Sequence, residues 1–163
     1  MATKYSIPAQ VYWDDVNEGD EIPSVDFNLT IQRMIIAAGG NRNFSPLHHN
    51  TTVGKAAGAG DMFLQNGSCL MLWERVVSDW CGIYARVKKV TFRITDFHNA
   101  GEKIHVGGKI ARKYQENGLH LVDLKMQSDT PRKVGMTGTV VLALPTRANL
   151  TGTPRWNAQG IAC

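Results

Sequence analysis

The chain has 163 residues, which suffices for one domain, and its 43% of hydrophobic residues are enough to form a buried core. It contains no apolar run as long as a membrane-spanning helix, and its first residues lack the hydrophobic stretch of a secretory signal. The net charge of +4 comes from scattered basic residues, whereas a nucleic-acid-binding protein would show a denser basic stripe.

The amino-terminal part of the chain predicts a short strand followed by a helix. Residues 1–24 are typical of an irregular lead-in, and residues 25–29 alternate weakly, as in a short strand. Thr30 is placed to cap the helix that follows, and Gly39-Gly40 ends it. Its apolar residues fall on one helical face: Ile31, Met34, Ile35 and Ala38.

A loop and a second, more apolar helix follow. Residues 41–50 predict an irregular loop, and a short helix then runs through Ala57. The second strong helical pattern opens at Gly67 and stops at Gly82. A helix that is apolar on more than one face is expected to be buried. Its apolar residues are Leu70, Met71, Trp73, Val76, Val77 and Trp80.

Four strand patterns fill most of the remaining chain and are separated by turn residues. They cover residues 87–97, 103–114, 119–126 and 134–144. Within the second of them, Gly107-Gly108 indicates a β-bulge. A run of helices followed by a run of strands predicts an α+β fold, in which an antiparallel sheet wraps around one central apolar helix.

The loop at residues 43–50 holds the most informative group of polar side chains. It places an amide, a hydroxyl and an imidazole within six residues, at Asn43, Ser45 and His48. Pro46 fixes its own φ and disfavours helix at Ser45, so the backbone here is expected to be irregular. Such a loop can direct Asn43 and His48 toward one point.

This arrangement resembles the signature of the MaoC-like acyl dehydratases and (R)-specific enoyl-CoA hydratases, which reads aspartate, any residue, asparagine, proline, aliphatic, histidine. Pro46, Leu47 and His48 match it, whereas Asn43 stands for the aspartate and Ser45 for the asparagine. The resemblance covers about residues 11–144. It implies one MaoC-like hot-dog domain over residues 1–163, with an irregular tail at 145–163. A closer likeness is to the short MaoC-like subunits of steroid side-chain degradation.

The resemblance implies the reversible hydration of a 2-enoyl-CoA thioester, which is a lyase reaction. In this reaction His48 would be the principal acid–base group, and Asn43 would orient the water. The thioester oxygen would be held by a backbone N–H of Gly67 or Ser68, because a helix amino terminus offers unpaired N–H groups and a partial positive charge.

The acyl-CoA would then contact two parts of the chain. Ser45, Asn66 and Ser68 are expected to bind the thioester end. Lys88 and Lys89 follow the central helix and are candidate partners of the nucleotide phosphates. Strand alternation places these two lysines on opposite faces, so only one of them can share a face with the site.

The sequence indicates no metal site and no separate cofactor, with coenzyme A entering only as part of the substrate. The five histidines show no metal-ligand spacing. The three cysteines, Cys69, Cys81 and Cys163, show no C-x-x-C pattern, and free thiols are typical of a reducing cytoplasm. We therefore expect a cytoplasmic protein with no nucleic-acid and no membrane partner.

An open sheet edge is the reason to expect an oligomer. A single sheet around one helix leaves an edge exposed, and proteins commonly pair such edges. The expected partner is a second copy, giving a homodimer, or a second MaoC-like chain, giving a heteromer.

Asn43 decides how much catalysis the sequence supports, because an amide has no titratable proton at neutral pH. Three explanations stay open: a non-catalytic or half-active member of a heteromer, a homologue that relies on His48 with Ser45, or an engineered replacement of the aspartate. Asp61 is the nearest carboxylate along the chain that could substitute. A non-catalytic partner subunit is therefore the alternative to a hydratase. A hot-dog thioesterase is a third reading, but it needs a carboxylate that the loop lacks.

Overall fold

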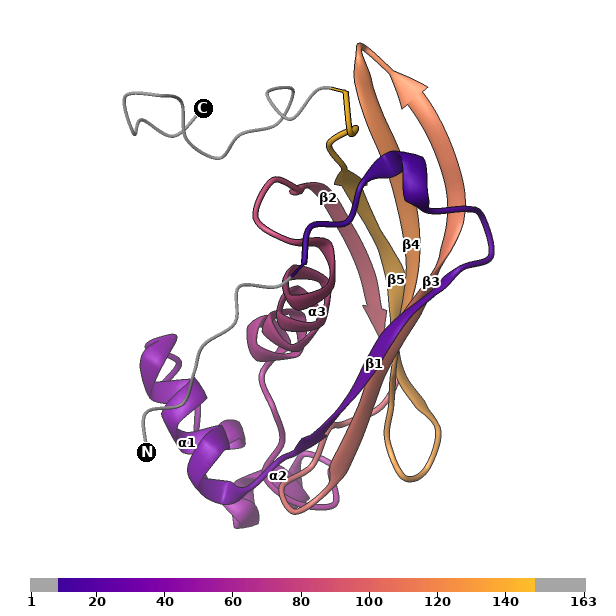
Figure 1. Ribbon diagram of the computed structural model, residues 1–163. Coiled ribbons are helices and arrows are strands. Elements are labelled where there is room, and N and C mark those ends of the chain that lie inside the picture. Colours follow the sequence, from indigo (N-terminus) through magenta and orange to yellow (C-terminus); the bar gives the residue numbers. More distant parts are fainter. Residues whose placement is uncertain (1–8, 149–163) are drawn as a thin grey trace, which may run out of the picture.

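The computed structural model describes residues 9–148, and its core is one five-stranded antiparallel sheet curved around a long helix (Figure 1). The strands are β1 (Glu21–Asn28), β2 (Arg86–Ile94), β3 (Lys103–Glu116), β4 (Leu119–Asp129) and β5 (Val134–Ala143), in the spatial order β1-β3-β4-β5-β2. The helices are α1 (Ile31–Gly40), α2 (Thr51–Ala56) and the long α3 (Asn66–Cys81), with short 3-10 turns η1 (Trp13–Asp15) and η2 (Pro46–His48). The expected α+β class, with its sheet around a central helix, is confirmed.

The central helix α3 supplies the core that the sheet wraps around. Trp73, Val76 and Val77 are each at most 2% exposed, and burial of each such side chain is worth about 1.5–3 kcal/mol relative to exposure. The indole N–H of Trp73 donates to the Ser128 hydroxyl of β4 at 2.6 Å, so the polar atom of this large ring is also paired. The helix is less enclosed than its apolar pattern predicts, since Met71 is 51% exposed.

Side-chain caps set the starts of the two shorter helices. Thr30 accepts a hydrogen bond from the backbone N–H of Arg33 at 3.2 Å, which confirms it as the cap of α1. Asn50 does the same for α2, where its side chain accepts from the N–H of Val53 at 3.2 Å. The Asn50 cap thus sets where the loop that carries η2 ends and α2 begins.

The apolar face of α1 packs only in part. Met34 and Ala38 are buried as expected, whereas Ile31 and Ile35 are 53% and 48% exposed. The reason is the place of α1, which lies apart from the sheet in Figure 1, so the strands do not cover this face. The predicted helix is present, but the buried part of its apolar face is narrower than the sequence predicts.

The two glycines of β3 do not form the expected bulge. The irregular pairing with β1 lies in β1 itself, around Ser24, and β3 bulges instead at Ala111. A Cβ added to Gly107 would lie 3.1 Å from the Cβ of Ser24, and one added to Gly108 would lie 2.5 Å from the sulfur of Met126. Neighbouring strands therefore leave little space for a side chain at Gly107 and none at Gly108, and this close approach, not a bulge of the strand, accounts for the glycines.

The start of the predicted tail lies against the beginning of the described chain. The N–H of Trp13 donates to the Pro145 carbonyl at 2.8 Å, and Arg147 forms an ion pair with Asp15 at 2.7 Å. The rest of the predicted tail, with Cys163, lies outside the described residues. The other two cysteines, Cys69 and Cys81, are buried.

Candidate functional site

His48 is held in one orientation by the backbone next to it in space. It ends the 3-10 turn η2, which begins directly after Ser45 in extended backbone, as Pro46 favours. Its Nδ1 lies 2.8 Å from the carbonyl oxygen of Phe63, and its half-buried ring meets the Phe63 ring edge-on with centroids 5.2 Å apart. A carbonyl only accepts, so the proton sits on Nδ1 and the lone pair of Nε2 is left for proton transfer.

Asn43 is tied into the fold at both ends of its amide. Its Oδ1 accepts the backbone N–H of Ser45 at 3.1 Å, and its Nδ2 donates to Oε1 of Gln65 at 2.8 Å. One Nδ2 proton and one Oδ1 lone pair then stay available, because an amide side chain offers two donor and two acceptor positions. Asn43 can therefore orient a water, but it cannot take a proton from it.

Gln65 is the residue of this site that the sequence did not single out. It is 7% exposed, and its Nε2 donates to the hydroxyl of Ser68 at 3.1 Å while its Oε1 receives Asn43. Asn41 donates to the same hydroxyl at 3.2 Å. A buried amide between two elements needs such partners, but no local pattern marks this glutamine as part of a site before the loop and α3 are brought together.

The amino terminus of α3 lies beside this network and is open at Gly67. Gln65 is the N-cap residue, yet its side chain caps none of the backbone N–H groups of the first turn. A Cβ added to Gly67 would meet no heavy atom within 4 Å, and Asn66 is exposed as well. The first N–H groups of a helix have no partner within the helix and carry a partial positive charge. They are available to a developing negative charge on a ligand oxygen.

Asp61 forms its hydrogen bonds at the start of α2 and with the residue next to it. Its Oδ1 accepts the hydroxyl of Thr51 and the backbone N–H of Met62, each at 2.6 Å. The hydrogen bond from Thr51 holds the pKa of Asp61 below its usual value. A carboxylate with a lowered pKa is a weaker base, and this one is already committed to the start of α2.

Lys88 and Lys89 lie far from the loop within one chain. They stand near the start of β2, after the carboxyl end of α3. Both line one groove of about 740 Å³ together with Tyr114 and Asp123, so the expected placement on opposite faces is wrong, because the pairing of β2 is irregular at Lys88. The 16 residues of α3 span roughly 24 Å at the usual rise per residue. The structure thus brings together Asn43, Ser45, His48, Asn66, Gly67 and Ser68, and leaves the two lysines at the other end of the helix.

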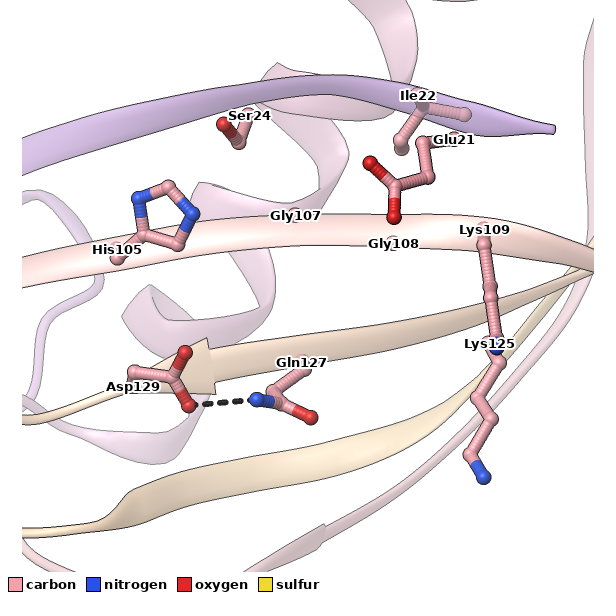
Figure 2. Close-up of a pocket in the computed structure, with 10 residues that line it drawn as sticks. All are labelled: Glu21, Ile22, Ser24, His105, Gly107, Gly108, Lys109, Lys125, Gln127 and Asp129. Carbon is pink, nitrogen blue, oxygen red and sulfur yellow. Dashed lines mark hydrogen bonds between the residues drawn. The ribbon is translucent and has the colours of Figure 1, made fainter.

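A second groove crosses the side of the sheet away from the loop. Its volume is about 460 Å³. Figure 2 shows the side chains of β1, β3 and β4 that line it, with Lys109 and Lys125 at one end and His105 and Asp129 at the other. Its charges are mixed, and it contains no residue of the loop at 43–50. This groove is therefore separate from the candidate site.

Two further observations concern the described part of the chain. Residues 9–148 hold no group of three or more histidine, cysteine, aspartate or glutamate side chains arranged to bind a metal ion. Among the helices of the same residues, none combines the length and the apolar character that crossing a bilayer requires.

Sequence comparisons found no relative. A scan against protein-family models gave no match, and a search of curated proteins gave none either. Comparison with solved structures, by contrast, found the same fold among MaoC-like dehydratases and (R)-hydratases. The hot-dog fold that the loop signature implied is confirmed.

Three of these structures show how far the likeness extends. A chain of the ChsH1-ChsH2 complex from Mycobacterium tuberculosis matches with a TM-score of 0.72 at 22% identity, over 78% of this chain and 98% of that one. The R-hydratase PhaJ1 from Pseudomonas aeruginosa gives 0.73 at 14% identity, over 87% and 90%. The (R)-hydratase from A. caviae involved in PHA biosynthesis gives 0.70 at 13% identity, over 80% and 98%. At these identities the likeness shows the fold, and function has to be argued from the site.

Proposed function

We propose that the chain binds an acyl-CoA thioester and catalyses the reversible hydration of a 2-enoyl-CoA, as a MaoC-like hydratase. The observation that carries this proposal is the contact between Nδ1 of His48 and the Phe63 carbonyl, which leaves Nε2 as a base. The same loop is linked through Asn43 and Gln65 to the amino terminus of α3. A base and a set of N–H donors at one place are what addition of water to an enoyl thioester needs.

The proposed reaction uses these groups in sequence. Nε2 of His48 takes a proton from a water that Asn43 orients, as the water oxygen forms its bond to Cβ of the enoyl group. The electron pair of the double bond moves toward the thioester, and the N–H of Gly67 or Ser68 stabilises the charge on its oxygen. The protonated His48 then returns the proton to Cα. One water is added, and the imidazole ends as it began.

The absence of the family's aspartate limits the proposed rate. A positioned acid or base contributes typically ~10²–10⁴ in rate. With Asn43 in that place, His48 carries both proton transfers alone. We therefore propose a slow hydratase rather than an efficient one.

The second candidate is a non-catalytic subunit that completes the site of a partner chain, and the free edge of the sheet favours it. In β2, Val87, Val90 and Phe92 are 45%, 40% and 38% exposed. Beside them, between α3 and β2, lies an apolar hollow of about 250 Å³. Exposed apolar surface along a sheet edge marks a contact with another chain. One of the structures with this fold comes from a complex of two different chains, which fits either a homodimer or a heteromer with a second MaoC-like chain.

One experiment separates the two candidates. Crotonyl-CoA and a bulky steroid enoyl-CoA are incubated with the natural chain and with His48→Ala, and hydration is followed by loss of the enoyl absorbance. We expect slow hydration by the natural chain and none by His48→Ala. Binding of an acyl-CoA without hydration by either protein would favour the partner subunit, and absence of binding would contradict both. A cytoplasmic location stays a prediction.

A further inference from the structure

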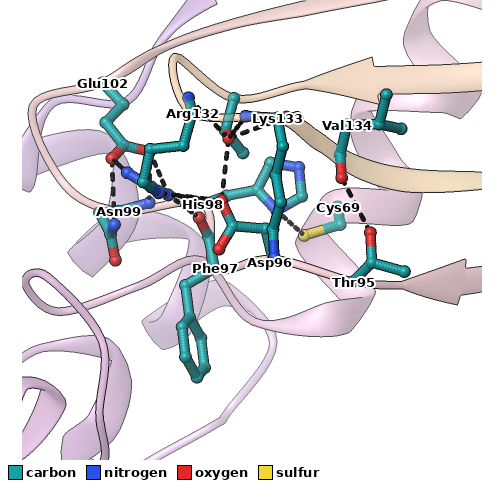
Figure 3. Close-up of polar contacts among 11 residues, drawn as sticks. Cys69, Thr95, Asp96, Phe97, His98, Asn99, Glu102, Arg132, Lys133 and Val134 are labelled. Atoms are coloured by element: carbon teal, nitrogen blue, oxygen red, sulfur yellow. Dashed lines mark hydrogen bonds and ion pairs between the residues drawn. The ribbon is translucent and has the colours of Figure 1, made fainter.

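Arg132, in the turn between β4 and β5, holds the segment that joins β2 to β3. Figure 3 shows its guanidinium among the side chains of that segment. Its Nε and Nη2 lie 2.9 Å from Oδ2 of Asp96, and its Nη1 forms an ion pair with Glu102. Its Nη2 also donates to the carbonyl of Phe97 at 2.6 Å. One side chain therefore fixes three points of residues 96–102.

These contacts differ from an ordinary surface ion pair because the two carboxylates are largely buried. The side chains of Asp96 and Glu102 are 12% and 14% exposed. Burial alone would raise the pKa of Asp96, but hydrogen bonds from Thr130 and Arg132 hold it below its usual value. Removal of Arg132 would leave two poorly solvated carboxylates without their shared cation, which is strongly unfavourable.

The segment held by Arg132 lies directly against the segment that orients His48. Backbone hydrogen bonds of 2.8 and 2.9 Å join residues 98 and 100 to residues 64 and 62, one on each side of Phe63. Glu102 strengthens this pairing, because it accepts both the backbone N–H and the Nδ2 of Asn99 at 3.0 Å. Asn99 itself forms a β-bridge with Phe63.

A second line of contacts runs through aromatic rings. The ring of Phe97, whose carbonyl binds Arg132, packs on the ring of Phe63 with centroids 4.6 Å apart. The Phe63 ring in turn meets the ring of His48. Both the backbone pairing and the ring stack therefore end at Phe63, and the Phe63 carbonyl is the atom that holds Nδ1 of His48.

We propose that Arg132 is a positioning residue for His48. It fixes residues 96–102, these fix Phe63, and the Phe63 carbonyl keeps the proton of the imidazole on Nδ1, which leaves the lone pair on Nε2. The role of Arg132 in catalysis rests on the proposed hydratase function, whereas its effect on the His48 imidazole does not.

The test compares Arg132→Ala with Arg147→Ala in the full chain. Arg147 is a matched control because it also pairs with a carboxylate, that of Asp15, but lies at the other end of the fold. We expect Arg132→Ala to speed amide hydrogen exchange at Leu64 and Ala100 by about tenfold or more and to weaken the NMR signal of the His48 Nδ1 proton. Arg132→Lys should restore part of both, and Arg147→Ala should change neither.

Unchanged exchange and an unchanged ring signal in folded Arg132→Ala would overturn the proposal. If that variant does not fold, Glu102→Gln, which weakens the ion pair but keeps the arginine, gives the same two readouts. In an active protein, Arg132→Ala should lower kcat while Arg147→Ala leaves it unchanged. If the natural chain proves inactive, the hydratase function fails, yet the exchange and ring measurements still decide the role of Arg132.

Discussion

At the scale of single residues, Asn43 and His48 are both held in place but differ in their ability to transfer a proton. Both are fixed by hydrogen bonds to other parts of the chain, to Gln65 and to the Phe63 carbonyl. Only the imidazole can exchange a proton at neutral pH. Both side chains are therefore held by hydrogen bonds, but they are not equally able to do acid–base chemistry.

Asn43→Asp is expected to raise hydratase activity, because a carboxylate restores a base beside His48. The gain should fall within the ~10²–10⁴ that one positioned acid or base contributes. It is measured as kcat/KM with crotonyl-CoA. Asn41→Asp is the matched control, since Asn41 also binds the network at Ser68 but lies outside the signature. Equal effects of the two substitutions would speak against the assignment.

His98 is expected to make the fold sensitive to mild acid. It is 2% exposed, and within the described residues its Nε2 has no hydrogen-bond partner. Burial lowers its pKa below the ordinary 6.5, although the charges of Asp96 and Glu102 act in the opposite direction. The unfolded chain then binds the proton more readily, so stability is complete above about pH 6.5 and is lost as the pH falls below it.

Urea unfolding at a series of pH values checks this expectation. The natural chain should lose up to about 1.4 kcal/mol of unfolding free energy per pH unit below that point from this group. His98→Gln should lose less over the same range, whereas His49→Gln, at an exposed histidine, should behave as the natural chain does. The same slope in all three proteins would show that other groups cause it.

At the scale of elements, α3 both organises the core and presents the site. Its interior face is joined to β4 by the hydrogen bond between Trp73 and Ser128. Its first turn has free space beside Gly67. The buried face of α3 thus fixes the position of its first turn.

Trp73→Phe is expected to destabilise the fold by about 1–3 kcal/mol in addition to the cost of the smaller ring. The Ser128 hydroxyl, in a residue 1% exposed, would lose the indole partner and stay buried. The measurement is the free energy of unfolding in urea. Adding Ser128→Ala should recover part of the loss, and no recovery in the double variant would mean that packing alone explains it.

The elements also show how far sequence alone could lead. Thr30 and Asn50 cap the helices that begin after them, and those caps depend only on residues three positions apart. Gly107 and Gly108 were misread as a bulge because the approach of Ser24 and Met126 comes from other strands. The buried face of α1 was predicted to be wider than it is, because burial depends on which other elements lie beside the helix.

At the scale of the whole molecule, the two edges of the sheet differ. The β2 edge carries exposed apolar side chains next to the hollow at α3, together with basic residues such as Lys88 and Lys89, and the β1 edge carries charged partners such as Asp26 with Lys103 and His105. Exposed apolar residues beside an apolar hollow favour contact with another chain. The molecule is therefore expected to associate through β2.

Light scattering should show a dimer or larger assembly of the natural chain at micromolar concentration. Val90→Lys is expected to shift it toward monomer, because a charge would be buried at the contact. Val25→Lys is the matched control, since Val25 is a similarly exposed valine on the opposite edge, at 37% against 40%. A well-folded monomer of the natural chain would refute this prediction.

The sequence by itself determined the order of the elements, the fold class and the loop that holds His48, because these follow from local backbone preference and from the period of apolar residues. Only the tertiary structure decided what fixes that loop. Asn43 meets Gln65 across 22 positions, His48 meets the Phe63 carbonyl across 15, and Arg132 meets Asp96 across 36. Such contacts depend on strand register and on the packing of α3 against the sheet, which no single stretch of sequence contains.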